Sequence, residues 1–153
     1  MPVPPRVSLI TLAVADVARS TAFYAALGWP LSFASQAEVS FFDLDGLVLS
    51  LYGRDALAAD LGLQPAAPPQ PGVAPTFTLA QNQRSREAVD RVLAEATAAG
   101  GTLLKAGHET HWGGYVGYVA DPDGHVWEIA HNPHWPLDAS GRIVLPGSAG
   151  DAA

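Results

Sequence analysis

The chain contains one pattern of segments twice, and this internal repeat restricts its possible folds more than any other feature. Ile10-Thr-Leu-Ala13 recurs as Phe77-Thr-Leu-Ala80, and the turn Asp43-Leu-Asp-Gly46 recurs as Asp121-Pro-Asp-Gly124. Each copy has the hydrophobic pattern of a strand, then that of a helix, then those of three short strands. The sequence therefore predicts two similar β-α-β-β-β modules.

The limits of these modules follow from composition. Residues 63–75 contain five prolines, which neither a helix nor a sheet interior tolerates, so we expect a linker there. Residues 134–153 become small and glycine-rich and are expected to form a surface tail. The two modules are thus expected at residues 7–62 and 76–133.

A single module of this kind covers one face of its sheet with its helix and cannot cover the other. Pairing two modules solves this problem. The predicted fold is therefore α+β, with both modules joined in a curved sheet of about eight strands, helices outside and a concave cavity inside. Such a concave face is the natural place for a small ligand.

Charge and composition restrict the class of partner. Eight basic and 15 acidic residues give a net charge of −7, which disfavours nucleic acid and anionic membranes. The chain has no cysteine, which excludes disulfides, thiolate nucleophiles and Cys-ligated metals. It shows neither a signal peptide nor an apolar run of about 20 residues, so we expect a cytoplasmic protein with a small-molecule partner.

Several motifs resemble the vicinal oxygen chelate superfamily, which includes glyoxalases, bleomycin-resistance proteins and extradiol dioxygenases. They are Asp16-Val-x-Arg-Ser with Phe23-Tyr24 and Leu27-Gly28, the stretch Trp112-Gly-Gly-Tyr115 of a glyoxalase-like branch, and Asp121-Pro-Asp-Gly-His-Val-Trp-Glu128. The resemblance covers roughly Val7 to Pro133. It implies the paired-module fold and a homodimer.

The resemblance also raises the question of a metal. In metal-dependent members, His or Glu side chains on the first and last strands of each module bind a divalent ion. The repeat places these four points at Leu9, Ser50, Thr76 and Glu128. A leucine cannot bind a metal, and neutral hydroxyls are weak ligands for a transition metal. We therefore expect no cofactor; a divalent metal held by the loop histidines is the disfavoured alternative.

Glu128 is the candidate catalytic residue, because a carboxylate on an apolar sheet face can act as a general base or anchor a ligand amine. The alternative is a structural role in which it hydrogen-bonds to Ser50 or Thr76. The loop 110–118 combines glycines with aromatic residues and is expected to close over a ligand, or else to be a bent edge strand. The candidate ligand-binding residues are Thr11, Ser50, Tyr52, Thr76, Thr78, His111, Trp112 and Glu128.

Two functions are compatible with these features. The first is a binding protein of the bleomycin-resistance type, which holds a small, cationic aromatic molecule without the standard metal; the acidic balance and the aromatic loop favour it. The second is a lyase, isomerase or dioxygenase that acts on a small oxygenated substrate, with Glu128 as base or as remaining metal ligand. A purely structural subunit has no feature in its favour.

Overall fold

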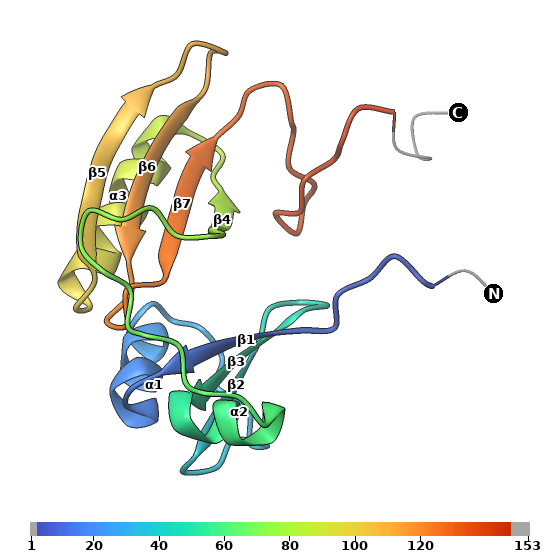
Figure 1. Ribbon diagram of the computed structural model, residues 1–153. Coiled ribbons are helices and arrows are strands. Elements are labelled where there is room, and N and C mark those ends of the chain that lie inside the picture. Colours follow the sequence, from blue (N-terminus) through green and yellow to red (C-terminus); the bar gives the residue numbers. More distant parts are fainter. Residues whose placement is uncertain (1–2, 148–153) are drawn as a thin grey trace. The chain divides into compact units, whose positions relative to one another are not determined.

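The computed structural model describes residues 3–147, which form two compact units. The first unit runs to Val73 and also includes Pro122–Gly124, and the second contains Ala74–Asp121 and the residues from His125 onward. Within these residues, the first unit combines a β-sheet with two helices and the second combines one with a single helix (Figure 1). The predicted α+β class is therefore confirmed. None of the helices within the described residues is long and apolar enough to cross a membrane.

The first unit is built on a three-stranded sheet with the strand order β1-β3-β2. Strand β3 runs parallel to β1 and antiparallel to β2. Its elements are β1 (Leu9–Val14), α1 (Val17–Ala26), β2 (Val39–Asp43), β3 (Val48–Gly53) and α2 (Arg54–Leu61).

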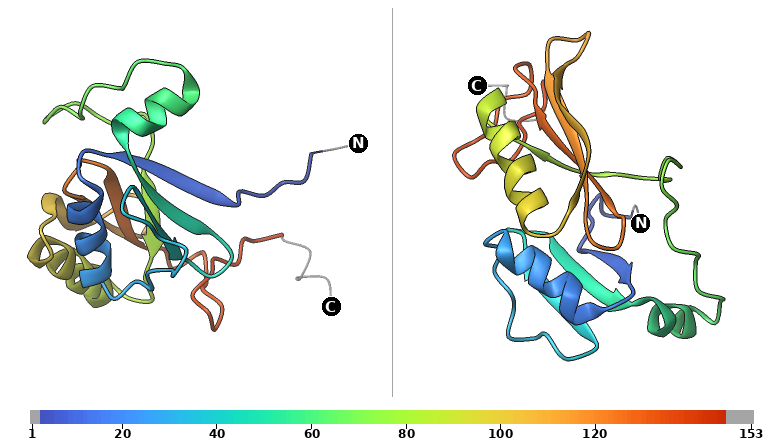
Figure 2. Two further views of the ribbon diagram at one scale, coloured as in Figure 1. Left: turned by 90° about the horizontal axis from the view of Figure 1, so that it is seen from below. Right: turned by 90° about the vertical axis from the view of Figure 1, so that its left-hand side faces the viewer.

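Helix α1 begins directly after Asp16, because the Asp16 side chain caps it by accepting a hydrogen bond from the Arg19 amide at 3.0 Å. The helix packs on one face of the sheet (Figure 2). There the Tyr24 ring lies 5.9 Å from the Phe42 ring, and both side chains are buried. Because this apolar contact covers one face of the first sheet, only the face away from α1 is available to other groups.

The second unit is built on a four-stranded sheet with the order β4-β7-β6-β5. Strand β4 is parallel to β7, and the other pairs are antiparallel. Its elements are β4 (Leu79–Asn82), α3 (Arg86–Ala98), β5 (Thr102–Glu109), β6 (Tyr115–Ala120) and β7 (Val126–His131). Helix α3 lies along one face of this sheet (Figure 2) and buries Val89 and Leu93 there.

Two predicted strands differ from the structure. The first sheet has three strands where the β-α-β-β-β pattern predicted four, because the expected strand after α1, over Pro30–Phe33, forms only a single bridge, Leu31 to Phe42. Proline lacks the amide that a longer ladder needs. The strand predicted from Thr76 begins only at Leu79. Its partner β7 begins at Val126, so the residues before Thr78 have no strand to pair with.

The connecting and terminal segments contain no named strand within the described range. Residues 63–75 have neither helix nor strand, and a left-handed Gly62 ends α2 before them. Part of the predicted tail folds back onto its own unit, since Arg84 donates hydrogen bonds to the Leu137 and Asp138 carbonyls. The rest of that tail, residues 148–153, lies outside the described residues.

Candidate functional site

The two faces of the second sheet differ in what covers them. On β6, the Tyr115 hydroxyl donates to Asp90 of α3 at 3.0 Å, and a Cβ added to Gly117 would collide with Leu93 of α3. These side chains therefore face the helix. Because side chains alternate along a strand, Tyr118 lies on the opposite face, which we call the α3-free face.

Glu128 lies on the α3-free face of the second sheet and is directly paired with Tyr118. The register of β6 and β7 places the two residues opposite each other, and the Tyr118 hydroxyl donates to Glu128 Oε2 at 3.0 Å. Both residues are half-buried. The neighbouring Trp127 and Ile129 face α3 and are buried, as their alternation with Glu128 predicts. The sheet thus presents one carboxylate and one phenol together.

The environment of this pair keeps the phenol protonated. Burial raises the pKa of Tyr118, and the hydrogen bond to Glu128 and its negative charge raise that pKa further. Tyr118 is therefore a hydrogen-bond donor at neutral pH. Glu128 Oε1 has no hydrogen-bond partner within residues 3–147, so the carboxylate can accept a second donor.

The β4 neighbour of the pair and the next residue pair along the β6–β7 hairpin are apolar. On the α3-free face, Ala80 of β4 lies beside Glu128 on one side, and Val116 and Ala130 form the next pair along the hairpin. Val116 and Ala130 are both buried. A carboxylate with apolar neighbours interacts more strongly with a ligand cation than one in open water does.

Three of the predicted ligand-binding residues share one face of the first sheet. Leu12 and Leu51 face α1 with Phe42, so Thr11, Ser50 and Tyr52 lie on the face away from α1. Thr11 and Ser50 are direct partners across β1 and β3, and Ser50 is buried. The Tyr52 hydroxyl donates to Asp60 of α2 at 2.9 Å, which raises the pKa of Tyr52.

Thr76 and Thr78 lie outside the sheet. Both precede β4 and are exposed, and Thr76 makes no hydrogen bond to Glu128. The repeat of the sequence also misplaces the equivalent positions. Leu9 pairs with Val48, and the repeated turn makes Val126 the equivalent of Val48. Because Leu79 pairs with Trp127, the residue that lies beside Val126 is Thr78. Thr78, rather than Thr76, is therefore the equivalent of Leu9.

The four points that a family metal would occupy do not provide a suitable set of donors. Leu9 has no donor atom in its side chain, and the hydroxyls of Ser50 and of either threonine are neutral. Within residues 3–147, no three His, Asp or Glu side chains come together so that they could hold an ion. A single carboxylate, Glu128, does not hold a transition metal against water.

His111 and Trp112 lie in the turn between β5 and β6 and are exposed. The turn is closed by hydrogen bonds between Thr110 and Gly114, and the Trp112 ring lies where a side chain on Gly114 would have to be. This turn precedes β6 at its Tyr115 end, whereas Glu128 pairs with Tyr118, farther along the strand. The structure therefore does not place His111 or Trp112 beside Glu128.

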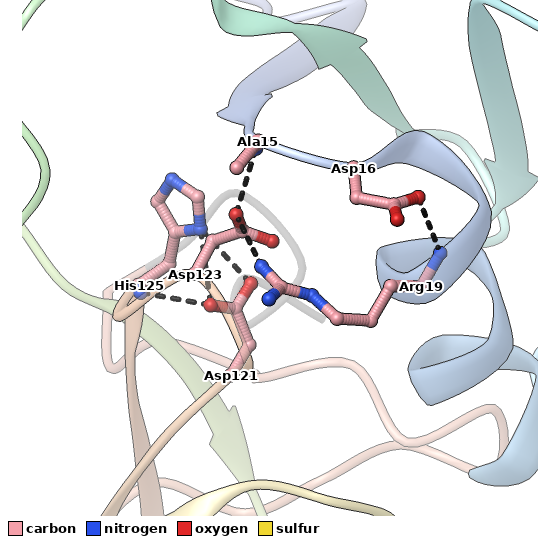
Figure 3. Close-up of polar contacts among 6 residues, drawn as sticks. All are labelled: Ala15, Asp16, Arg19, Asp121, Asp123 and His125. Atoms are coloured by element: carbon pink, nitrogen blue, oxygen red, sulfur yellow. Dashed lines mark hydrogen bonds and ion pairs between the residues drawn. The ribbon is translucent and has the colours of Figure 1, made fainter.

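The motif that most resembles the superfamily has a structural role (Figure 3). Asp123 Oδ1 accepts hydrogen bonds from the Ala15 amide at 2.8 Å and from the Arg19 guanidinium at 3.0 Å. Its side chain is 1% exposed. Asp121 accepts a hydrogen bond from the His125 amide at 2.9 Å, and the His125 ring nitrogen Nδ1 lies 2.9 Å from the same carboxylate. The bonds of Asp123 stabilise the start of α1, and those of Asp121 stabilise the β6–β7 turn.

Sequence reasoning missed Tyr118 as the partner of Glu128, since the loop 110–118 was expected to be a flexible loop or a bent edge strand. A usable signal was present. The Asp121–Gly124 turn pairs Ala120 with Val126, and counting equally along both strands from that pair reaches Tyr118 and Glu128. The contacts of Asp123 had no such signal, since Ala15 is 108 residues away in the chain.

Comparisons with known proteins agree with this architecture. The family model of the glyoxalase/bleomycin resistance protein/dioxygenase superfamily matches residues 6–129. A glyoxalase-related enzyme from Fulvimarina pelagi is 37% identical, with a TM-score of 0.83 over 92% of this chain and 98% of that one. No curated protein matches.

More distant solved structures share the fold alone. A glyoxalase/bleomycin resistance protein/dioxygenase family enzyme from Burkholderia phytofirmans PsJN is 23% identical, with a TM-score of 0.67 over 81% of this chain and 96% of that one. A lactoylglutathione lyase from Agrobacterium tumefaciens is 20% identical, with a TM-score of 0.64 over 88% of this chain and 99% of that one. The chain belongs to the glyoxalase/bleomycin resistance protein/dioxygenase superfamily, as its motifs predicted.

Proposed function

We propose that this protein binds a small aromatic molecule with a basic group on the α3-free face of its second sheet, and that it does so without the standard metal of the superfamily. The observation that carries the proposal is the hydrogen bond of 3.0 Å between the Tyr118 hydroxyl and Glu128 Oε2. It orients the carboxylate and leaves Oε1 for a donor on the ligand.

The chemistry of the two side chains supports a cationic group. Glu128 accepts hydrogen bonds and attracts positive charge, and the Tyr118 ring provides an aromatic surface next to it. The exposed Ala80 beside Glu128 offers an apolar contact to an aromatic body. Residues at the four family positions offer too few charged donors for a metal, so the carboxylate is available to the ligand itself.

The test uses para-methylbenzylamine as a probe and isothermal titration calorimetry as the measurement. Glu128→Gln keeps the size of the side chain and removes its charge, so the affinity should fall about tenfold. Glu95→Gln is the matched control, because Glu95 lies on α3 and forms an exposed ion pair there, 3.9 Å from Arg91. Equal affinities of wild type and Glu128→Gln would refute the proposal.

A second candidate function is an enzyme in which Glu128 is the base. The observation in its favour is the solved structure that is 37% identical, which is that of a glyoxalase-related enzyme. Such a base would take a proton from the carbon next to a carbonyl, and Tyr118 would hold the carboxylate in place. The test is hydrogen–deuterium exchange on hydroxyacetone in heavy water, followed by NMR. Exchange that the protein accelerates and Glu128→Gln abolishes would favour the enzyme, and exchange at the buffer rate would exclude this reaction.

A further inference from the structure

We propose that the ligand carries an acidic group as well as a basic one, and that Lys105 of β5 binds the acidic group. This inference rests on the proposed ligand site at Glu128 and names the chemical class of its ligand: a small aromatic compound with opposite charges at its two ends.

The first observation is the register of three neighbouring strands. Lys105 of β5 pairs with Tyr118 of β6, and Tyr118 pairs with Glu128 of β7. Directly paired residues in antiparallel strands have their side chains on the same face of the sheet. Lys105, Tyr118 and Glu128 therefore form one row across the α3-free face.

The second observation is that a bulge brings Lys105 to this face. Leu103 pairs with Val119 on the face of α3, and it lines a groove of about 490 Å³ between α3 and β5. In a regular strand Lys105 would share that face, because side chains two residues apart point the same way. The register shifts between Leu103 and Lys105, so the lysine pairs with Tyr118 instead. Bulges that redirect one side chain are frequent next to functional sites.

The third observation concerns charge. Lys105 is the one lysine of the chain, is exposed, and makes no ion pair with any residue from 3 to 147. Neighbouring strands lie about 4.8 Å apart, so the backbones of Lys105 and Glu128 are separated by roughly 10 Å. An aromatic ring with an amine at one end and a carboxylate at the other spans this distance over Tyr118, because the long lysine side chain can extend toward the carboxylate of the ligand.

A competing explanation exists for the same residue. Strand β5 is an edge strand of the second sheet, and lysines and bulges on edge strands prevent pairing with other chains. The two explanations predict different results when the charge is removed. If Lys105 binds a ligand, its loss changes the preference among ligands; if it guards the edge, its loss changes self-association.

The experiment compares three probes by isothermal titration calorimetry: para-(aminomethyl)benzoate, para-methylbenzylamine and para-methylbenzoate. Wild type should bind the doubly charged probe about fivefold more tightly than the amine alone. Lys105→Met should abolish this preference and leave the affinity for the amine unchanged, whereas Lys105→Arg should retain it. Arg91→Met removes the same charge from α3 and is the control that should retain the preference.

The failures of the two proposals differ. Equal affinities of wild type for the doubly charged probe and the amine, or an unchanged preference in Lys105→Met, would overturn the role of Lys105 alone. Self-association of Lys105→Met in sedimentation velocity with the preference intact would assign Lys105 to edge protection and also overturn it. An affinity for the amine that Glu128→Gln does not lower would refute the ligand site itself, and no binding of any probe to wild type would refute both.

Discussion

The Asp123 side chain offers a quantitative test of the structural role of the Asp-Pro-Asp-Gly turn. Asp123→Ala removes the acceptor of the Ala15 amide, and a hydrogen bond to a charged group contributes about 1.5–3 kcal/mol. It also removes the ion pair with Arg19, which adds only about 0.5 kcal/mol because the Arg19 side chain is 50% exposed. The expected loss in the free energy of unfolding is thus about 2–3.5 kcal/mol.

Asp123→Asn separates the two contributions. Its amide oxygen can still accept from Ala15, but the charge opposite Arg19 and near the start of α1 is lost. We expect a loss of about 1 kcal/mol, measured with the alanine variant by urea unfolding followed by circular dichroism. Probe binding at Glu128 should be unchanged in both variants. A loss below about 0.5 kcal/mol for Asp123→Ala would refute this reasoning.

Three further predictions follow from the second unit. Gly117→Ala places a Cβ against Leu93 and should lower the free energy of unfolding by about 1–3 kcal/mol, as urea unfolding would show; an unchanged midpoint would contradict this packing. The raised pKa of Tyr118 means that its proton is held more tightly in the folded state, so stability present below about pH 10 should be lost as the pH rises through the folded pKa. Tyr118→Phe should flatten this decline above about pH 10, and an equal fall in the free energy of unfolding of both proteins with pH would contradict it. Elemental mass spectrometry of untagged protein should find less than about one tenth of a divalent metal ion per chain, and a melting temperature that chelator lowers would contradict this.

The sequence alone predicted the fold class, because the repeat, the caps and the turns are local features. Asp16 illustrates this, because an aspartate directly before a helical pattern is a typical N-cap and its side chain does cap α1. The face of Glu128 was also predictable, since alternation along β7 separates it from Trp127. These inferences need only the order of residues along one element.

Other features depend on how strands pair, and the sequence repeat predicted these poorly. The likeness of Ile10–Ala13 to Phe77–Ala80 is one of residue type, whereas hydrogen bonding to β7 sets the register of β4 and excludes Thr76 from the sheet. The face on which Lys105 lies depends on a bulge in β5, and no local sequence pattern predicts this bulge. Sequence reasoning therefore missed the residues of the candidate site whose positions depend on the pairing of strands that are distant in the sequence.

The most direct test of the central claim is a map of ligand contacts by NMR. Isotope-labelled protein would be titrated with para-methylbenzylamine, and chemical-shift changes would be assigned to residues. The account predicts that the largest changes lie at Tyr118, Glu128 and their neighbours on the α3-free face of β6 and β7. Changes confined to the groove between α3 and β5, or to the turn that carries Trp112, would contradict it.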